Sequence, residues 1–257
     1  MSELLRAEGL SMHFGGLVAV SRFHLKLVPG EIVGLIGPNG AGKTTVFNMI
    51  TGVYRPTEGC LVFEDRDITG LRPDQITYRG IARTFQNIRL FPNLTTLENV
   101  MVGHHLRLNS SPVGAILRLP LYQREAKRIR DESEALLNIL GLGQYMNEKA
   151  TSLPYGQQRR LEIARALATK PKLLLLDEPA AGMNPAEGLL LMEFIQQIRQ
   201  DFSLTILLIE HDMRVVMGVC ERIMVLDYGL TIAEGGPHEI QNDQRVIKAY
   251  LGVENGA

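Results

Sequence analysis

Short apolar runs separated by glycine or proline turns dominate the start of the chain. The first 30 residues alternate between apolar and polar positions, with turn-forming pairs at Gly15-Gly16 and Pro29-Gly30, which predicts antiparallel strands. Ile32 to Ile36 is a continuous apolar run, followed by a glycine-rich turn and a helix-like stretch from Gly42 to about Thr51. We therefore expect a strand, a loop and a helix in that order.

Residues 53–70 predict a further hairpin, and the pattern then becomes helical from about Pro92 to Leu167. Positions on one helical face recur every three or four residues, at Ala126, Ile129, Ser133, Leu136 and Leu140. Gly141 follows them as the expected C-cap. The stretch Asn109–Pro120 contains Ser, Pro and Gly and predicts a loop, within an insertion that spans about residues 104–124.

Two strongly apolar runs come next, at Leu173–Leu176 and Leu204–Ile209, with a helix-like stretch at residues 186–200 between them. Fully apolar strands joined by a helix predict a βαβ unit in a parallel sheet that is buried on both faces. From about Ile223 the pattern returns to short strands, and it ends in a helix near Arg245–Leu251. The chain therefore has the pattern of an α/β protein.

The composition of the chain argues against several classes of function. The 257 residues carry a net charge of −1, whereas proteins that grip nucleic acid by its phosphates usually have a basic excess, so we expect no nucleic-acid partner. The 2 cysteines, Cys60 and Cys220, predict neither a disulfide framework nor a metal cluster and suit a reducing compartment. No apolar run approaches the ~20 residues that span a bilayer, and charges near the start argue against a signal peptide. We therefore expect any link to a membrane to run through a partner.

Gly37–Thr44 matches the phosphate-loop pattern G-x-x-x-x-G-K-[ST] between a predicted strand and helix. Glycines let backbone N–H groups turn toward phosphate oxygens, and the following helix adds the positive end of its dipole. We expect Lys43 to reach the β- and γ-phosphates of ATP and the Thr44 hydroxyl to ligate Mg²⁺. Further contacts are expected from Asn39, Gly40, Ala41, Gly42 and Thr45. An incidental glycine turn is the alternative, and it would match by chance in only about 1% of such chains.

Asp177 and Glu178 follow the apolar run Leu173–Leu176 directly. Ligands of parallel sheets bind at the carboxyl ends of the strands. We expect Asp177 to hold Mg²⁺, directly or through water, and Glu178 to orient or deprotonate an attacking water. Two acids that merely end a strand in solvent are the alternative, which the upstream phosphate loop disfavours.

Five motifs, in their order and spacing, resemble those of the nucleotide-binding subunits of ATP-binding cassette (ABC) transporters over nearly the whole chain. They are Gly37–Thr44, Gln86, Leu153-Pro154-Tyr155-Gly156-Gln157, Asp177-Glu178-Pro179 and His211. The resemblance implies an ATPase in which Gln86 contacts Mg²⁺ and the attacking water. It also implies that His211 binds the γ-phosphate and keeps Glu178 and the water in register.

The same resemblance places Phe14 where the family usually has an aromatic side chain that stacks on adenine, with Val18 and Val20 as flanking apolar contacts. Comparable stacking on bases is worth ~1–3 kcal/mol. The alternative is that Phe14 is a core phenylalanine. Gln86 alone would be a solvated loop residue, and His211 alone a structural histidine.

The fold that the resemblance implies is a single ABC ATPase domain over residues 1–257. This α/β domain would combine a RecA-like parallel-sheet core with an antiparallel β subdomain and an α-helical subdomain. Residues 1–86 and 168–257 would form the catalytic core with the β subdomain. Residues 87–167 would form the helical subdomain that carries the signature motif.

In this family the signature motif of one subunit completes the ATP site of another, which adds Tyr155, Gly156 and Gln157 to the expected nucleotide-binding residues. A helix that opens at Gly156-Gln157 would offer unpaired N–H groups to the γ-phosphate. Pro154 and Tyr155 depart from the usual Ser and Gly, because proline lacks a hydroxyl and an N–H and tyrosine adds bulk. Ala181–Asn184 also departs from the common Ser-Ala-Leu-Asp. These departures predict a heterodimer with unequal sites, and leave open a homodimer of the isolated chain.

Several stretches look like the G-type ATPase subunits of bacterial branched-chain amino acid importers: Met12–Leu17, Tyr155–Arg165, Glu178–Gly182 and Ile247–Gly252. That resemblance implies a second, paralogous ATPase, two transmembrane permeases and, indirectly, a periplasmic solute-binding protein. The chain would then sit on the cytoplasmic face of the bacterial inner membrane.

Alternative interpretations share part of this evidence. The ATPase of a urea importer or of a lipopolysaccharide exporter would use the same cassette. A soluble ABC protein of DNA repair or translation would carry long heptads or two cassettes, which this chain lacks. A small-molecule kinase would leave Gly156-Gln157 and His211 unexplained. The residues alone do not name the transported solute.

Overall fold

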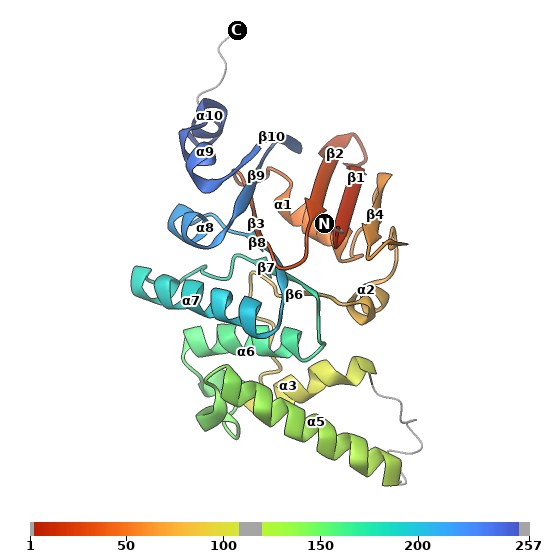
Figure 1. The fold of residues 1–257 in the computed structure, drawn as a ribbon, viewed down its shortest axis with the longest axis vertical. Helices are drawn as coiled ribbons and strands as arrows, with labels where there is room; N and C mark the ends of the chain where they lie inside the picture. Colours follow the sequence, from red (N-terminus) through yellow and green to blue (C-terminus); the bar gives the residue numbers. More distant parts are fainter. Residues whose placement is uncertain (1–2, 108–119, 252–257) are drawn as a thin grey trace.

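The computed structural model describes residues 3–107 and 120–251, which form two sheets and the helices around them (Figure 1). The larger sheet has the strand order β10-β9-β3-β8-β7-β6. Its strands are β3 (Ile32–Ile36), β6 (Ile81–Arg83), β7 (Leu173–Asp177), β8 (Thr205–Ile209), β9 (Arg222–Asp227) and β10 (Leu230–Gly235). All neighbours are parallel except β9 and β10. The predicted βαβ unit is confirmed in β7 and β8.

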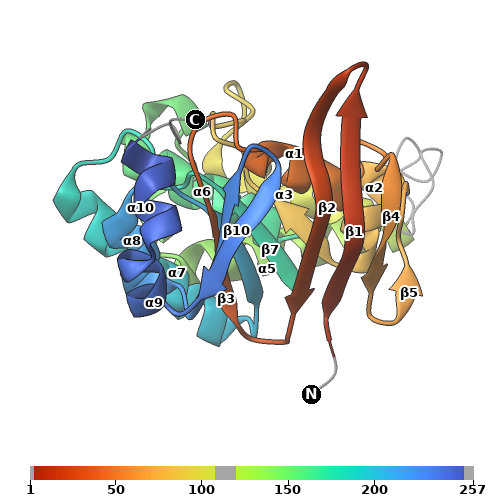
Figure 2. The ribbon, with the colours of Figure 1, turned by 90° about the horizontal axis from the view of Figure 1, so that it is seen from above.

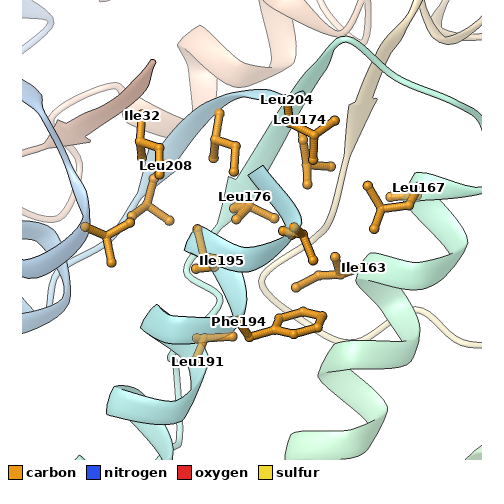
Figure 3. Packing of buried hydrophobic residues seen from close by; sticks show 14 of the residues in the cluster. Ile32, Ile163, Leu167, Leu174, Leu176, Leu191, Phe194, Ile195, Leu204 and Leu208 are labelled. Atoms are coloured by element: carbon orange, nitrogen blue, oxygen red, sulfur yellow. The ribbon is translucent and has the colours of Figure 1, made fainter. Parts of the chain in front are cut away.

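The larger sheet is buried on both faces, because its strands point alternate side chains into two apolar cores. In β3, Ile32 and Ile36 belong to one core, and Val33 and Leu35 belong to the other. The first core includes side chains of α6 (Tyr155–Leu167), α7 (Pro185–Asp201) and α8 (Met213–Val219). Figure 3 shows the side chains of α6 and α7 packed against those of the sheet. The second core includes α1 (Lys43–Ile50) and the smaller sheet.

The smaller sheet is antiparallel, with the order β2-β1-β4-β5. Its strands are β1 (Leu5–Phe14), β2 (Leu17–Leu27), β4 (Glu58–Phe63) and β5 (Arg66–Asp67). The expected strands and turns of the first 30 residues and the expected later hairpin are therefore confirmed. Figure 2 shows the β1–β2 turn projecting beyond the rest of this sheet, which carries Phe14 to the tip.

Local sequence explains where several helices begin. α7 starts after Asn184, whose side chain accepts from the N–H groups of Ala186 and Glu187, and Pro185 occupies the first helical position. Thr95 and Glu98 form a capping box at the start of α3 (Thr96–His104). The helices expected after the glycine-rich turn and between the two apolar runs are confirmed as α1 and α7.

α3, α5 (Pro120–Ile139) and α6 form a helical layer on one side of the molecule, and α5 buries Ile129, Ser133 and Leu136 as its sequence predicts (Figure 1). Gly141 has a φ of 72° and follows the last turn of α5, so the predicted C-cap is confirmed. Short 3₁₀ turns cover His105–Arg107, Gly143–Tyr145 and Ala150–Ser152. The loop predicted at residues 109–120 lies outside the described residues, apart from residue 120, which begins α5.

The sequence did not predict α2 (Pro73–Arg79) or β6. The tail contains β9 and β10, then α9 (Pro237–Asn242) and α10 (Gln244–Leu251), so its expected strands and final helix are confirmed. Within residues 3–107 and 120–251, no helix combines the length and the apolar character needed to cross a bilayer.

Both cysteines are held as thiols. Cys220 is buried after α8, close enough to β3 that a Cβ on Gly34 would lie 3.0 Å from its sulfur. Burial raises the pKa of the Cys220 thiol to about 12. Burial and a contact with the Glu8 carboxylate also raise the pKa of Cys60 on β4. Neither thiol is therefore activated as a nucleophile.

Candidate functional site

The loop between β3 and α1 has a conformation that only glycine permits at two positions. Gly37 has a φ of 148°, and a Cβ there would lie 2.0 Å from the Leu226 carbonyl oxygen. Gly42 has a φ of 102°, and its Cβ would lie 2.6 Å from the Ala19 carbonyl oxygen. The loop therefore packs directly against the backbones of β9 and β2.

Lys43 lies beneath this loop and is only 7% exposed. Its ammonium donates to the carbonyl oxygens of Gly37, at 2.7 Å, and Pro38, at 2.9 Å. Burial lowers the pKa of Lys43, and the nearby carboxylates of Glu178 and Asp177 oppose that shift. A buried cation is thus held by backbone oxygens next to two acidic groups.

A cleft of about 640 Å³ opens beside the loop, within the size range of small-ligand sites. It is lined by Phe14, Leu17, Val18, Ala19, Asn39, Gly40, Ala41, Gly42, Lys43, Thr44, Thr45, Gln86, Glu178 and Tyr228. The structure therefore brings the predicted phosphate-loop residues together with Phe14, Val18, Gln86 and Glu178. Val20 is not part of this lining, because it is fully buried in the core.

Two aromatic side chains stand at the rim of the cleft. Phe14 is 42% exposed and packs edge-on against Tyr54, with ring centroids 5.3 Å apart. Tyr228 is 87% exposed, in the turn between β9 and β10. Sequence reasoning missed Tyr228. The pairing of β9 with β3 was the missing information, because it brings the end of β9 next to the phosphate loop.

Asp177 ends β7 and is almost fully buried. Its carboxylate accepts from the Arg83 guanidinium at 2.6 Å, and Arg83 also donates to the Asn48 side chain at 2.6 Å. The guanidinium carbon lies 5.4 Å from the ring centre of Phe47 and 5.1 Å from that of Phe85. Sequence reasoning did not foresee Arg83, which pairs with Asp177 because β6 lies next to β7.

Asp177, the exposed Thr44 and Gln86 offer hard oxygen ligands, the type that Mg²⁺ prefers. Among the described residues, no cluster of three His, Cys, Asp or Glu side chains could hold a metal by itself. This set fits an ion that takes one or two protein ligands and completes its shell with water and phosphate oxygens. It does not fit a zinc site.

Gln86, Glu178 and His211 meet although they are far apart in the chain. The Gln86 side-chain amide donates to Glu178 Oε2 at 2.8 Å, and His211 Nδ1 lies 3.6 Å from the same oxygen. The three residues follow β6, β7 and β8, which are neighbours in the parallel sheet. A hydrogen bond from Gln86 and the nearby His211 ring can together fix the direction of this carboxylate toward the cleft.

Glu178 has a backbone φ of 47°, in the left-handed region that costs a non-glycine residue about 1–3 kcal/mol. Its N–H donates to the Ile209 carbonyl at 2.9 Å, and its own carbonyl accepts from Ala181 at 3.1 Å. Such a conformation persists only where neighbouring contacts fix it.

Glu210 is a fully buried carboxylate that sequence reasoning missed. It accepts from the N–H groups of Ala180 at 2.7 Å, His211 at 3.0 Å and Asp212 at 3.4 Å. Burial raises the pKa of Glu210, and these hydrogen bonds partly offset the rise. Glu210 therefore joins the segment after Glu178 to the loop of His211.

Tyr155, Gly156 and Gln157 do not lie in the cleft. Gly156 and Gln157 line a separate depression of about 210 Å³ against α7. α6 begins at Tyr155, one residue before the expected start. The Tyr155 hydroxyl donates to the Ala181 carbonyl at 2.9 Å, so the ring extends toward the segment after Glu178.

The chain is similar to known families and proteins over nearly its whole length. A family model described as ABC transporter matches residues 20–181, and one described as branched-chain amino acid ATP-binding cassette transporter matches residues 231–255. The chain is 48% identical over 249 residues to the high-affinity branched-chain amino acid transport ATP-binding protein LivG of Escherichia coli, covering 97% of this chain and 98% of LivG. It is 44% identical, with the same coverage, to BraF of Pseudomonas aeruginosa, which has the same description.

A solved structure supports the fold independently. The ADP conformation of MJ1267, an ATP-binding cassette of an ABC transporter, superposes with a TM-score of 0.86 at 31% identity. The alignment covers 98% of this chain and 100% of MJ1267. The cassette fold that the motifs implied is therefore confirmed.

Proposed function

The chain belongs to the ATP-binding cassette family of transporter ATPases, and from that premise we propose that it is the ATP-hydrolysing subunit of a high-affinity branched-chain amino acid importer. The convergence of Gln86 and His211 on the Glu178 carboxylate, beside the loop of Lys43, carries the assignment of hydrolysis. The likeness to LivG and BraF, and the family match over residues 231–255, support the transported class.

The residues in and beside the cleft would have separate roles in the reaction. N–H groups of Asn39–Thr45 and the Lys43 ammonium bind the phosphates of ATP, and Phe14 supports the adenine. Thr44, Asp177 and Gln86 would hold Mg²⁺, which supplies charge neutralisation at the β- and γ-phosphates. Glu178 orients or deprotonates the attacking water, and the products are ADP and phosphate.

Gln86 and His211 keep the Glu178 carboxylate directed at that water, because both lie against one of its oxygens. The Arg83 guanidinium donates to Asp177, the acidic residue that precedes Glu178 at the end of β7. The charged groups of Asp177, Glu178 and Lys43 are thereby held in place before ATP binds. The site then needs less rearrangement to reach the transition state.

We propose the assembly from two surfaces outside the nucleotide cleft, the signature residues and the groove beside the Gln86 loop. Tyr155, Gly156 and Gln157 would face the ATP site of a second, paralogous ATPase. A groove of about 840 Å³ beside the Gln86 loop would receive a cytoplasmic helix of one of the two permeases. Arg89 and Arg165 line this groove, over the rings of Phe85 and Phe91. The chain would then lie at the cytoplasmic face of the inner membrane, and a periplasmic solute-binding protein would act through the permeases.

The division into parts is proposed on the same basis. Residues 1–86 and 168–257 would act as the catalytic core with its β subdomain, and residues 87–167 as a helical subdomain. The helical part carries the signature residues and lines one side of the permease groove.

The test is to purify tagged Glu178→Gln in MgATP from gently solubilised native membranes and to identify the co-purifying proteins by mass. This variant should bind ATP without hydrolysing it, so the paired ATPase subunits should stay closed on the nucleotide. The matched control is Lys43→Ala/Glu178→Gln, which should retain less nucleotide and so fewer closed complexes. Two permeases with a second ATPase would support the proposal. A single ATPase with exporter-type subunits, permeases of a urea importer, or no membrane partner would contradict the importer assignment.

A further inference from the structure

Helix α6 touches both loops that border the Glu178 carboxylate. It lies between α7 and the remaining helices of the helical layer (Figure 1). Its first turns carry Tyr155, Arg159 and Glu162 on one face. Tyr155 is 43% exposed, whereas Arg159 and Glu162 are fully or almost fully buried. A buried ion pair is costly unless its polar groups are satisfied, so its partners indicate what it holds.

Arg159 and Glu162 hold the loop of Gln86 through its backbone. The two side chains pair at 2.8 Å. Arg159 donates to the carbonyl oxygens of Phe85, at 2.7 Å, and Gln86, at 2.8 Å. The other carboxylate oxygen of Glu162 accepts from the N–H groups of Phe85, at 3.4 Å, and Arg89, at 3.3 Å.

Tyr155 extends the same network to the opposite side of Glu178. One Arg159 nitrogen, which donates to Gln86, also lies 3.4 Å from the Tyr155 hydroxyl. That hydroxyl donates to the Ala181 carbonyl at 2.9 Å, and the Ala181 N–H donates to the Glu178 carbonyl at 3.1 Å. A chain of hydrogen bonds thus runs from the Gln86 backbone through α6 to the strained backbone of Glu178.

We infer that Tyr155 is a positioning residue for Glu178, acting within its own chain through the hydrogen bond from its hydroxyl to Ala181. This inference rests on the proposed role of Glu178 in hydrolysis. It gives the tyrosine at the third signature position a role that a glycine cannot have, because glycine has no side chain to reach Ala181. The signature helix would thereby set the direction of the catalytic carboxylate in the subunit that carries it.

Tyr155→Phe removes the hydroxyl and keeps the ring, so it tests the contacts of the hydroxyl with Ala181 and Arg159 without loss of the aromatic packing. In the full chain with its co-purified membrane subunits, we expect kcat for ATP to fall about fivefold while KM changes less than about twofold. Amide hydrogen exchange in residues 179–184 should become faster. The thermal midpoint should stay unchanged. Tyr122→Phe, which removes the same atom from α5, is the matched control and should change none of these quantities.

Three outcomes would overturn the inference. Unchanged kcat and exchange would mean that the hydroxyl positions nothing. A higher KM at unchanged kcat would mean that it serves only the nucleotide of a partner subunit and does not position Glu178. A lower thermal midpoint with a matching loss of active protein would mean a purely structural role. Rapid turnover by Glu178→Gln in the same assay would instead contradict the proposed catalytic residue, and the exchange result for Tyr155→Phe would still report on the hydrogen bond.

Discussion

The phosphate loop and the loop of Gln86 meet in one cleft but are built in opposite ways. The phosphate loop owes its path to its own glycines, and Lys43 binds carbonyls only five and six residues earlier. The Gln86 loop is held by Arg159 and Glu162, which lie 73 to 77 residues later in the chain. One loop is therefore specified locally, and the other depends on the placement of a distant helix.

This difference predicts different responses to structural change. A loop fixed by its own backbone should bind nucleotide whatever the helical layer does. A loop fixed by α6 should move when α6 moves. We therefore expect ATP binding to tolerate movement of the helical layer, and the alignment of Gln86 with Glu178 to depend on the position of α6.

The largest expected effect breaks the distant support. Arg159→Met leaves the Glu162 carboxylate buried without its cation, which should lower the free energy of unfolding by about 3–5 kcal/mol in denaturant titrations. ATP turnover should fall, and nucleotide binding by the folded fraction should persist. Arg159→Met/Glu162→Leu should recover part of the stability, because no unpaired charge remains.

The matched control is Arg130→Met on α5. Arg130 pairs with Glu134 at the same 2.8 Å, but both side chains are exposed. An exposed pair of this kind should change stability by no more than about 1 kcal/mol. Equal losses for Arg159→Met and Arg130→Met would contradict the view that the buried pair supports the Gln86 loop.

The next largest effect breaks the local loop. Lys43→Ala removes the buried cation, so ATP affinity should fall and kcat/KM should drop about 10²–10³-fold, or about 3–4 kcal/mol. Stability should change little compared with Arg159→Met. Lys172→Ala, at the opposite end of β7 from Asp177, should leave hydrolysis unchanged. Near-normal hydrolysis by Lys43→Ala would refute the assignment of the loop.

A smaller effect sharpens the contrast between binding and alignment. Phe14→Ala should weaken ATP binding by about 1–3 kcal/mol, measured as Kd by titration, because the base loses its stacking surface. The kcat at saturating ATP should remain unchanged, since Phe14 touches neither Gln86 nor Glu178 in the network described. Phe14→Trp should restore the affinity. A loss of kcat without a change in Kd would remove Phe14 from the nucleotide site.

The smallest effect is a pH dependence at Glu210. Burial raises the pKa of folded Glu210 above its ordinary value of 4.5, so its stabilising contribution is present below that value and is lost as pH rises through the folded pKa. Glutamine does not titrate. The thermal midpoint of Glu210→Gln minus that of the unaltered protein should therefore increase as pH rises from about 4 to 8. A constant difference over that range would contradict a raised pKa of Glu210. His211 faces position 210 in both proteins, so it is present on both sides of the comparison.

Sequence alone predicted the parts of the fold and site that local pattern determines. β3, β7 and β8 are short and wholly apolar, and Gly37 and Gly42 mark a loop that needs glycine. The three-residue β6 carries no comparable signal, so the sheet neighbour of β7 was not predicted.

The missing β6 explains most of what sequence reasoning could not find in the site. Arg83 meets Asp177 only because β6 and β7 are adjacent. The partners of Tyr155 and Glu210 are backbone groups in other loops, and no side-chain pattern announces a contact with a carbonyl or an N–H. Gln86 and His211 were placed by resemblance to a family, and their roles remain predictions.

The two quiet thiols make this chain convenient for chemical labelling. Cys220 is buried with a pKa of about 12, and the pKa of Cys60 is also raised, so both should react slowly with maleimides near neutral pH. A cysteine introduced at the exposed Leu17, on the projecting β1–β2 turn, should then take up nearly all of a fluorophore. The fluorescence of that single label could report nucleotide binding in the cleft. Neither native cysteine would have to be removed.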